Sequence, residues 1–493
     1  FIIFVVENFM DGCFLFLQEK IDITKYKNKQ REKVIEMKKI KCKIKNYREK
    51  KMIMKKHCLK LAAAAIFLIQ ASWIAAGNEF PLKDGDTWVF VGDSITAQKL
   101  HTNYFEAFCV TRFPNWSLHF RNSGVGGDTI PRVLARFDWD VAAWKPTVVS
   151  IELGMNDAGA GPNSVDAYVK GMETLIARVR EIGARPILFS ASPVNDGTTM
   201  KSLAGRNVTL DKYAAALREL SQKNDIPYAD QFHALVDIWG KNKPRENLIR
   251  FANSVQAILC NPILPDADLL TQWLNQWRAN PLAKQSVDLG GDQVHPGPVG
   301  QLTMSCALLK ELGAPGLVSR ASLDASGRIL ETDKCMITNV SATSDSLTFD
   351  RLDQCLPMPI PEETYPALTL YPAIADLSQW MLTVKNLPGG VYTVTIDGIK
   401  SGIVTADELA RGWNMISMTE GPVAAQTKQV LTLIAEKEAL VAQWRTRSAA
   451  AFKNPAEKTA LDALTVQVLE ADKKIKEAAQ PRMHKFSISP FKP

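Results

Sequence analysis

Between residues 85 and 315, short apolar runs alternate with longer amphipathic stretches, and this rhythm constrains the fold more than any other feature of the chain. The short runs are typical of strands, and the stretches between them are typical of helices. Strands that alternate with helices favour one parallel sheet with helices on both faces. The expected strands are 87–91, 118–120, 147–152, 186–190 and 226–229, and the expected helices lie near 97–112, 130–143, 165–182, 210–224 and 300–312.

Four short polar blocks follow the expected strands or precede the last expected helix. They are Gly92-Asp93-Ser94, Gly126-Gly127-Asp128, Gly154-Met155-Asn156-Asp157 and Asp292-Gln293-Val294-His295. Each block is weak evidence by itself, but the ordered set is specific. Because parallel sheets of this kind place their sites in loops at the carboxyl ends of the strands, we expect the four blocks to meet there.

The residue types in these blocks are those of serine-based ester hydrolysis. Ser94 lies at a strand-to-helix turn, where its hydroxyl is exposed and the helix N-terminus favours negative charge. Asp292 can accept from one ring nitrogen of His295 while the other nitrogen faces Ser94. The Gly127 N–H and the Asn156 amide can donate to an oxyanion.

The identity of the base is open on spacing alone, because the chain holds a second Asp-x-x-His. Asp230 and His233 follow an expected strand and enter an expected helix, where the histidine can simply pack. Asp292 and His295 lie in a glycine-rich loop that Pro296 ends, which suits a histidine that reaches across to another loop. We therefore favour His295 over His233.

As an ordered set, the four blocks resemble those of the SGNH hydrolases, the GDSL-like esterase superfamily. The resemblance covers about residues 84–315. It implies a flavodoxin-like three-layer α/β/α fold, no metal and no other cofactor. It also implies a nucleophile Ser94, a base His295 supported by Asp292, and an oxyanion hole made by the N–H groups of Ser94 and Gly127 and by the Asn156 side chain. The long interval between the third and fourth blocks departs from the compact family pattern, as does the extension after residue 318, so the substrate stays open.

Charge is unevenly distributed along the chain. Residues 1–60 hold 17 basic and 7 acidic residues, whereas the remaining residues hold 42 basic and 45 acidic residues. The net charge of +7 therefore comes from the amino-terminal stretch. The composition of the rest does not indicate a nucleic-acid partner.

The amino-terminal stretch is expected to lie outside the fold. Residues 54–77 combine a basic start, an apolar run and small residues at Ala75-Ala76-Gly77, which is the pattern of a signal peptide. A membrane anchor is the alternative, but the apolar run is short for a bilayer span, so no stable span is expected after cleavage. Residues 1–53 are expected to be a disordered upstream segment.

Three further regions are expected beyond the core alternation. Residues 236–285 hold Trp239, Trp273 and Trp277 and predict a helical insertion, either a wall of the site or an ordinary packed excursion. Strand-like runs and Pro/Gly turns at 319–420 predict a small β-rich module. Apolar residues at helical spacing predict a C-terminal helical hairpin over 423–479.

The cysteines do not decide the compartment. Five of the eight follow the expected cleavage site. Cys335 and Cys355 can bridge a loop in an oxidising compartment or remain buried thiols. No Cys/His cluster has metal-ligand spacing.

The sequence thus predicts a periplasmic or secreted ester hydrolase that acts through an acyl-enzyme, with a small-molecule or polysaccharide ester as substrate. Deacetylation of carbohydrate esters is the favoured activity. The alternatives are a lysophospholipase or thioesterase of the same family, and a non-catalytic glycan-binding protein on the same fold. The oligomeric state is open.

Overall fold

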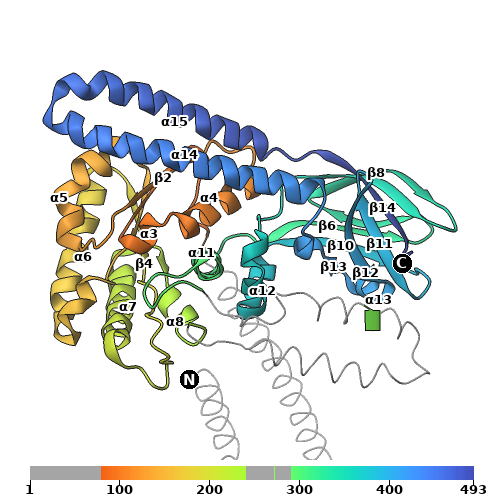
Figure 1. Ribbon diagram of the computed structural model, residues 1–493, viewed down its shortest axis with the longest axis horizontal. Helices are drawn as coiled ribbons and strands as arrows, with labels where there is room; N and C mark the ends of the chain where they lie inside the picture. Colours follow the sequence, from red (N-terminus) through yellow and green to blue (C-terminus); the bar gives the residue numbers. More distant parts are fainter. Residues whose placement is uncertain (1–78, 240–270, 273–289, 493) are drawn as a thin grey trace, which may run out of the picture. The chain divides into compact units, whose positions relative to one another are not determined.

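Five parallel strands form the first sheet, in the order β2-β1-β3-β4-β5 (Figure 1). The computed structural model describes residues 79–239, 271–272 and 290–492. This strand order is the flavodoxin-like doubly wound arrangement, and it confirms the predicted fold class. The strands are β1 (Thr87–Gly92), β2 (His119–Gly124), β3 (Val148–Glu152), β4 (Arg185–Phe189) and β5 (Tyr228–Ala229).

Alternate residues of the sheet face two separate hydrophobic clusters. Val89 and Val91 of β1 belong to one cluster, whereas Trp88 and Phe90 belong to the other. This alternation follows from the two-residue period of a strand. The first cluster is covered by α5 (Ile130–Asp140), α6 (Val165–Glu181), α7 (Gly205–Asn224) and α8 (Gln231–Leu235), and the second by α4 (Leu100–Arg112) and α11 (Pro298–Glu311).

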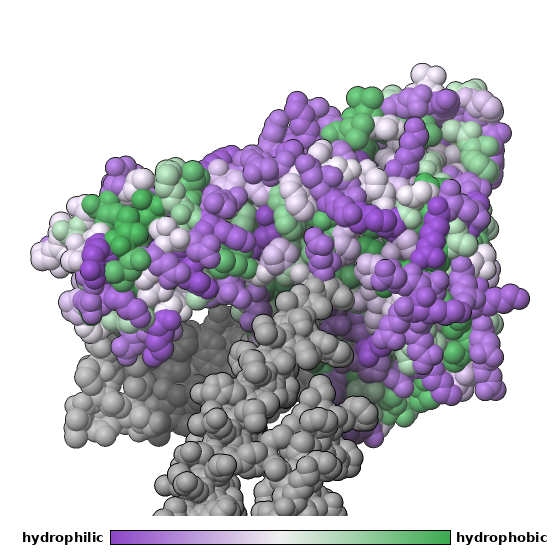
Figure 2. All heavy atoms as spheres, turned by 180° about the vertical axis from the view of Figure 1, so that it is seen from behind, coloured by the Kyte–Doolittle hydropathy of each residue, from purple (hydrophilic) through white to green (hydrophobic). Residues whose placement is uncertain are grey.

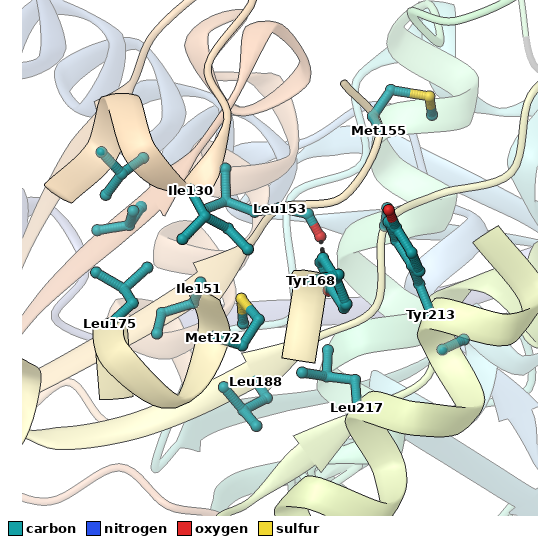
Figure 3. Close-up of a cluster of buried hydrophobic side chains, with 14 of the residues drawn as sticks. Ile130, Ile151, Leu153, Met155, Tyr168, Met172, Leu175, Leu188, Tyr213 and Leu217 are labelled. Carbon is teal, nitrogen blue, oxygen red and sulfur yellow. Dashed lines mark hydrogen bonds between the residues drawn. The ribbon is translucent and has the colours of Figure 1, made fainter. Parts of the chain in front are cut away.

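The first cluster supports the end of β3, where one of the polar blocks begins. Figure 3 shows Ile151 of β3 and Leu188 of β4 packed with Met172 of α6. The Tyr168 hydroxyl donates to the Leu153 carbonyl over 3.0 Å. Burial of each large apolar side chain contributes about 1.5–3 kcal/mol. The backbone that leads into Asn156 is therefore held by a packed apolar core.

The helix expected near residues 97–112 is two helices. The short α3 (Ser94–Ala97) is followed by α4, which begins at Leu100. Lys99 separates them in a left-handed conformation with φ of 67°. A non-glycine residue with this φ cannot continue a right-handed helix, so the chain turns there.

Two further sheets pack face to face over a shared hydrophobic cluster that includes Leu323, Trp380 and Phe486. One sheet has the order β13-β10-β6-β7 and the other has the order β12-β11-β14-β9-β8. The strands are β6 (Leu317–Asp324), β7 (Ile329–Asp333), β8 (Cys335–Ala342), β9 (Leu347–Asp353), β10 (Gln379–Lys385), β11 (Val391–Ile396), β12 (Ile399–Thr405), β13 (Trp413–Asn414) and β14 (Met483–Pro490). Two short helices, α12 (Pro366–Leu370) and α13 (Ala406–Arg411), connect these strands.

The helical hairpin consists of α14 (Pro422–Lys453) and α15 (Lys458–Ala478), which lie side by side (Figure 1). The chain does not end with the hairpin. It returns as β14, which pairs antiparallel with both β9 and β11. The hairpin is therefore an excursion between two strands of the β-rich region, a connection that the sequence did not indicate.

Buried ion pairs connect the hairpin to α4 and to β2 of the first sheet. Lys437 of α14 is fully buried and lies 2.6 Å from Glu106 of α4. Asp472 of α15 lies 2.6 Å from Arg121 of β2, and both side chains are buried. Removal of one partner from such a buried pair costs about 3–5 kcal/mol. The hairpin is thus part of the structure that surrounds β2.

The surface is mostly hydrophilic on the face shown in Figure 2, with hydrophobic residues in separate small groups. Among the described helices, none combines the length and apolar character needed to cross a bilayer. Cys335 and Cys355 are free thiols rather than a disulfide. The expected upstream segment, the signal peptide and most of the expected insertion at 236–285 lie outside the described residues.

Candidate active site

Ser94 is the first residue of α3, directly after β1. Asp93 caps the helix by accepting a hydrogen bond from the Ile95 N–H over 3.0 Å. Gly92 makes the tight turn possible, because a Cβ there would lie 1.9 Å from the Thr96 hydroxyl oxygen. The sequence therefore places the Ser94 hydroxyl at a strand end with the N-terminus of α3 behind it.

His295 lies within hydrogen-bond distance of Ser94, although 201 residues separate them. The distance from His295 Nε2 to Ser94 Oγ is 2.8 Å, and that from His295 Nδ1 to Asp292 Oδ2 is 2.9 Å. A carboxylate beside Nδ1 favours the tautomer that carries its proton there, so Nε2 can accept the serine proton.

The Asp292 carboxylate is fixed by its own loop. One carboxylate oxygen accepts from the backbone N–H groups of Val294 and His295, each over 2.7 Å. These bonds, with the His295 side chain, lower the pKa of Asp292 to about 2. Asp292 therefore stays ionised at neutral pH, and the 67% exposure of its side chain also favours the charged form.

The remaining two blocks lie beside the serine. Gly127 adopts a φ of 72°, which strongly favours glycine. The Asn156 amide nitrogen donates to the Asp128 carbonyl over 2.8 Å and lies 3.5 Å from Asp93. Asn156 thus links the loop that carries Gly127 to the residue before Ser94.

His233 does not reach this site. Its Nδ1 lies 2.8 Å from Asp230 and its Nε2 lies 2.9 Å from Asp211. Both ring nitrogens are therefore engaged by carboxylates, and the histidine helps to join α7 to α8.

A buried polar group behind Ser94 was not anticipated. His101 of α4 forms an ion pair with Glu152 at 3.0 Å, and each side chain is at most 7% exposed. Gln301 of α11 accepts from the His101 backbone N–H, and Gln231 donates to Glu152 over 2.8 Å. A glutamate at the end of a fully buried strand is the sequence signal that could have indicated this group.

This group influences Asp93. Burial raises the pKa of Asp93 to about 7, the hydrogen bond from Ile95 opposes this shift, and the Glu152 charge adds to it. Burial lowers the pKa of His101, but the charge of Glu152, the hydrogen bonds to Glu152 and Gln301, and the charge of Asp93 together raise it above its ordinary value. Charge beside Ser94 is thus set by Asp93 in the turn after β1, by Glu152 of β3 and by His101 of α4.

The turn between β2 and α5 is held by an arginine that the sequence also did not single out. Arg136 of α5 donates to the Asp128 carboxylate and to the Ser123 carbonyl, both over 2.7 Å. Its spacing of four from Asp140 was the only signal in the sequence. In the described part of the chain, no three His, Cys, Asp or Glu side chains form a group that could hold a metal ion.

Comparison with known proteins gives a family match over residues 90–301, to the GDSL-like Lipase/Acylhydrolase family. An uncharacterized lipoprotein, YqeF, from Bacillus subtilis (strain 168) is 26% identical over 153 residues, which are 27% of this chain and 63% of that protein. An acetylxylan esterase from Geobacillus stearothermophilus is 21% identical over 263 residues, which are 48% of this chain and 98% of that protein.

A similar fold is found in the solved structure of BT4096, a gut microbial diltiazem-metabolizing enzyme. The two chains superpose with a TM-score of 0.64 at 21% identity, over 84% of this chain and 99% of that one. The likeness therefore extends beyond the first sheet into the β-rich region and hairpin. The family match, the strand order and the four blocks show that the chain carries a GDSL-like lipase/acylhydrolase domain of the SGNH hydrolase type.

Proposed function

We propose that the protein is an exported serine ester hydrolase that removes acetyl groups from carbohydrate through an acyl-enzyme. The observation that carries the proposal is the 2.8 Å distance from His295 Nε2 to Ser94 Oγ, with Asp292 on the other ring nitrogen. A nucleophile, a base and a group that orients the base are the parts that such a reaction needs.

In the proposed reaction, Ser94 Oγ attacks the acyl carbon while His295 Nε2 takes the serine proton. The N–H groups of Ser94 and Gly127 and the Asn156 amide donate to the oxyanion that forms. The intermediate then collapses, and the C–O bond to the alcohol breaks as His295 returns the proton to the alcohol oxygen. Water, deprotonated by His295, attacks the acyl-enzyme and releases the acid together with free Ser94.

Three observations support export and a carbohydrate acetyl ester as the substrate. The relative from Geobacillus stearothermophilus is an acetylxylan esterase. The other relative is a lipoprotein, which is consistent with export. The β-rich region after Leu317 is of a kind that extracellular glycan enzymes often carry.

The test is a comparison of model esters of increasing acyl length with the chain from Asn78, which forms one compact unit. A short acyl pocket predicts a much higher kcat/KM for 4-nitrophenyl acetate than for the octanoate. Release of acetate from acetylated xylan and other acetylated polysaccharides then identifies the alcohol part.

Ser94→Ala serves as the control, and it should lose nearly all turnover without loss of folding. Equal rates for the two esters, or faster octanoate hydrolysis, would instead indicate a lysophospholipase or thioesterase. Retention of polysaccharide with no hydrolysis of any ester would indicate a binding protein and contradict the proposal.

A further inference from the structure

An arginine of the helical hairpin contacts the turn that carries Gly127. Residue 445 of α14 lies outside the family match at residues 90–301. We propose that Arg445 is a positioning residue for ester hydrolysis, because it holds the turn from Gly124 to Asp128 that carries the oxyanion donor Gly127. This inference rests on the proposed function and adds the hairpin to the machinery of that site.

Arg445 contacts Gly124, the first residue of this turn, and Asp140, the last residue of α5. Its Nη1 donates to the Gly124 carbonyl over 2.9 Å. Its Nε and Nη2 donate to the two carboxylate oxygens of Asp140, each over 2.6 Å. A guanidinium that donates in parallel to both oxygens of a carboxylate fixes direction as well as distance.

Asp140 connects Arg445, through Arg136, to Asp128 at the other end of the turn. Its carboxylate is fully buried and also pairs with Arg136. Arg136 in turn donates to the Asp128 carboxylate over 2.7 Å. Gly124 and Asp128, the two ends of the turn, are therefore tied to one largely buried group of two arginines and two aspartates.

The Gly124 end of the turn also touches the helix that carries the nucleophile. A Cβ at Gly124 would lie 2.4 Å from the Ala97 backbone nitrogen in α3. The next residue, Val125, donates its N–H to the Gly92 carbonyl over 3.2 Å. A displacement of Gly124 would therefore alter the spacing between the Gly127 N–H and Ser94, on which oxyanion stabilisation depends.

The same helix offers a matched control. Arg447 lies two residues further along α14, where it pairs with Glu457 at the exposed start of the second half of the hairpin. Its side chain is 50% exposed, against 18% for Arg445. A substitution at Arg447 removes a charge and an ion pair from the hairpin without touching the turn.

The experiment measures kcat and KM for 4-nitrophenyl acetate, together with Tm, in wild type, Arg445→Lys, Arg445→Gln and Arg447→Gln. Lysine keeps a positive charge beside Asp140 but cannot span both acceptors as the guanidinium does. We expect both Arg445 variants to lower kcat by about 10- to 100-fold with KM changed less than about twofold, because misplaced catalytic groups affect the transition state. Arg447→Gln should keep wild-type kcat.

A second measurement separates positioning from stability. The rate at which a fluorophosphonate modifies Ser94 should fall in parallel with kcat in the Arg445 variants, since the phosphonyl oxygen needs the same donors. A wild-type kcat in Arg445→Lys, an equal loss in Arg447→Gln, or failure of both Arg445 variants to fold would overturn the inference. A wild-type protein without ester turnover would instead contradict the proposed function.

Discussion

The two Asp-x-x-His segments share one local geometry and differ in what the outer ring nitrogen meets. In each, the aspartate accepts from the histidine backbone N–H, over 3.1 Å at His233 and 2.7 Å at His295. In each, Nδ1 lies close to the same aspartate, at 2.8 Å and 2.9 Å. The Nε2 of His233 meets Asp211, whereas the Nε2 of His295 meets Ser94.

Sequence spacing therefore specifies an oriented histidine, and the position of the segment in the fold decides its role. Asp230 is 3% exposed at the start of α8, so its pair with His233 links elements of the interior. Asp292 is 67% exposed in a loop before α11, and its histidine can reach another strand end. A base needs a free, directed nitrogen near a nucleophile, which only the second segment offers among the described residues.

The largest expected contrast comes from removing each histidine. His295→Ala should lower kcat for 4-nitrophenyl acetate by about 10⁴- to 10⁶-fold, because no base remains for Ser94. His233→Ala should leave kcat within about threefold of wild type, since effects of this size come from structural adjustment alone. Steady-state kinetics on both variants decides the comparison, and an inactive His233→Ala beside an active His295→Ala would reverse the assignment.

Substitutions of the two aspartates should have different effects: loss of Asp292 should lower activity, and loss of Asp230 should lower stability. Asp292→Ala should lower kcat by about 10²- to 10⁴-fold, because His295 loses its orientation and the partner for its positive form. Asp230→Ala should keep kcat but lower the free energy of unfolding by about 2 kcal/mol, because a buried helix cap and hydrogen bonds are lost.

Urea titration and initial rates on the same preparations test this pair of variants. The distinction between the two segments fails if Asp230→Ala loses activity without loss of stability, or if Asp292→Ala has wild-type kcat.

The smallest expected effect is in the pH dependence of stability at His233. Its hydrogen bond to Asp230 raises the pKa of His233 above the value in the unfolded chain. The contribution of the charged form is therefore full below about pH 6.5 and is lost as the pH rises through the folded-state pKa. Because the ring is partly exposed, we expect less than about 1 kcal/mol.

His233→Gln should thus flatten the pH dependence of the unfolding free energy from about pH 6 upward, as measured by urea titration at several pH values. If the stability of the variant depended on pH as steeply as that of wild type, protonation of His233 beside Asp230 would not contribute to folding.

The first sheet was predictable because its signals are local. Runs such as 87–91 and 147–152 are rich in β-branched and aromatic residues, and the structure places β1 and β3 there. Parallel strands then bring their carboxyl ends together, which explains how the blocks of Ser94, Gly127 and Asn156 could be grouped from sequence. The break at Lys99 was missed, since nothing in the residue type predicts a left-handed conformation there.

The distant contributions were not predictable. β14 follows the hairpin and lies in the middle of a sheet, between β9 and β11. This position depends on pairing between segments that are remote in the sequence. In the sequence, Arg445 is an ordinary charge on a long helix, and only its contacts with Gly124 and Asp140 in the fold indicate a role. Such residues acquire their roles from tertiary contacts that periodicity does not encode.

The most direct test of the account is to identify the residue that a fluorophosphonate modifies, by mass spectrometry of peptides from wild type, His295→Ala and His233→Ala. We predict one adduct, on the peptide that contains Ser94, in wild type and His233→Ala, and none at the same exposure time in His295→Ala. An adduct at another residue, or labelling of Ser94 that persists without His295 and disappears without His233, would contradict it.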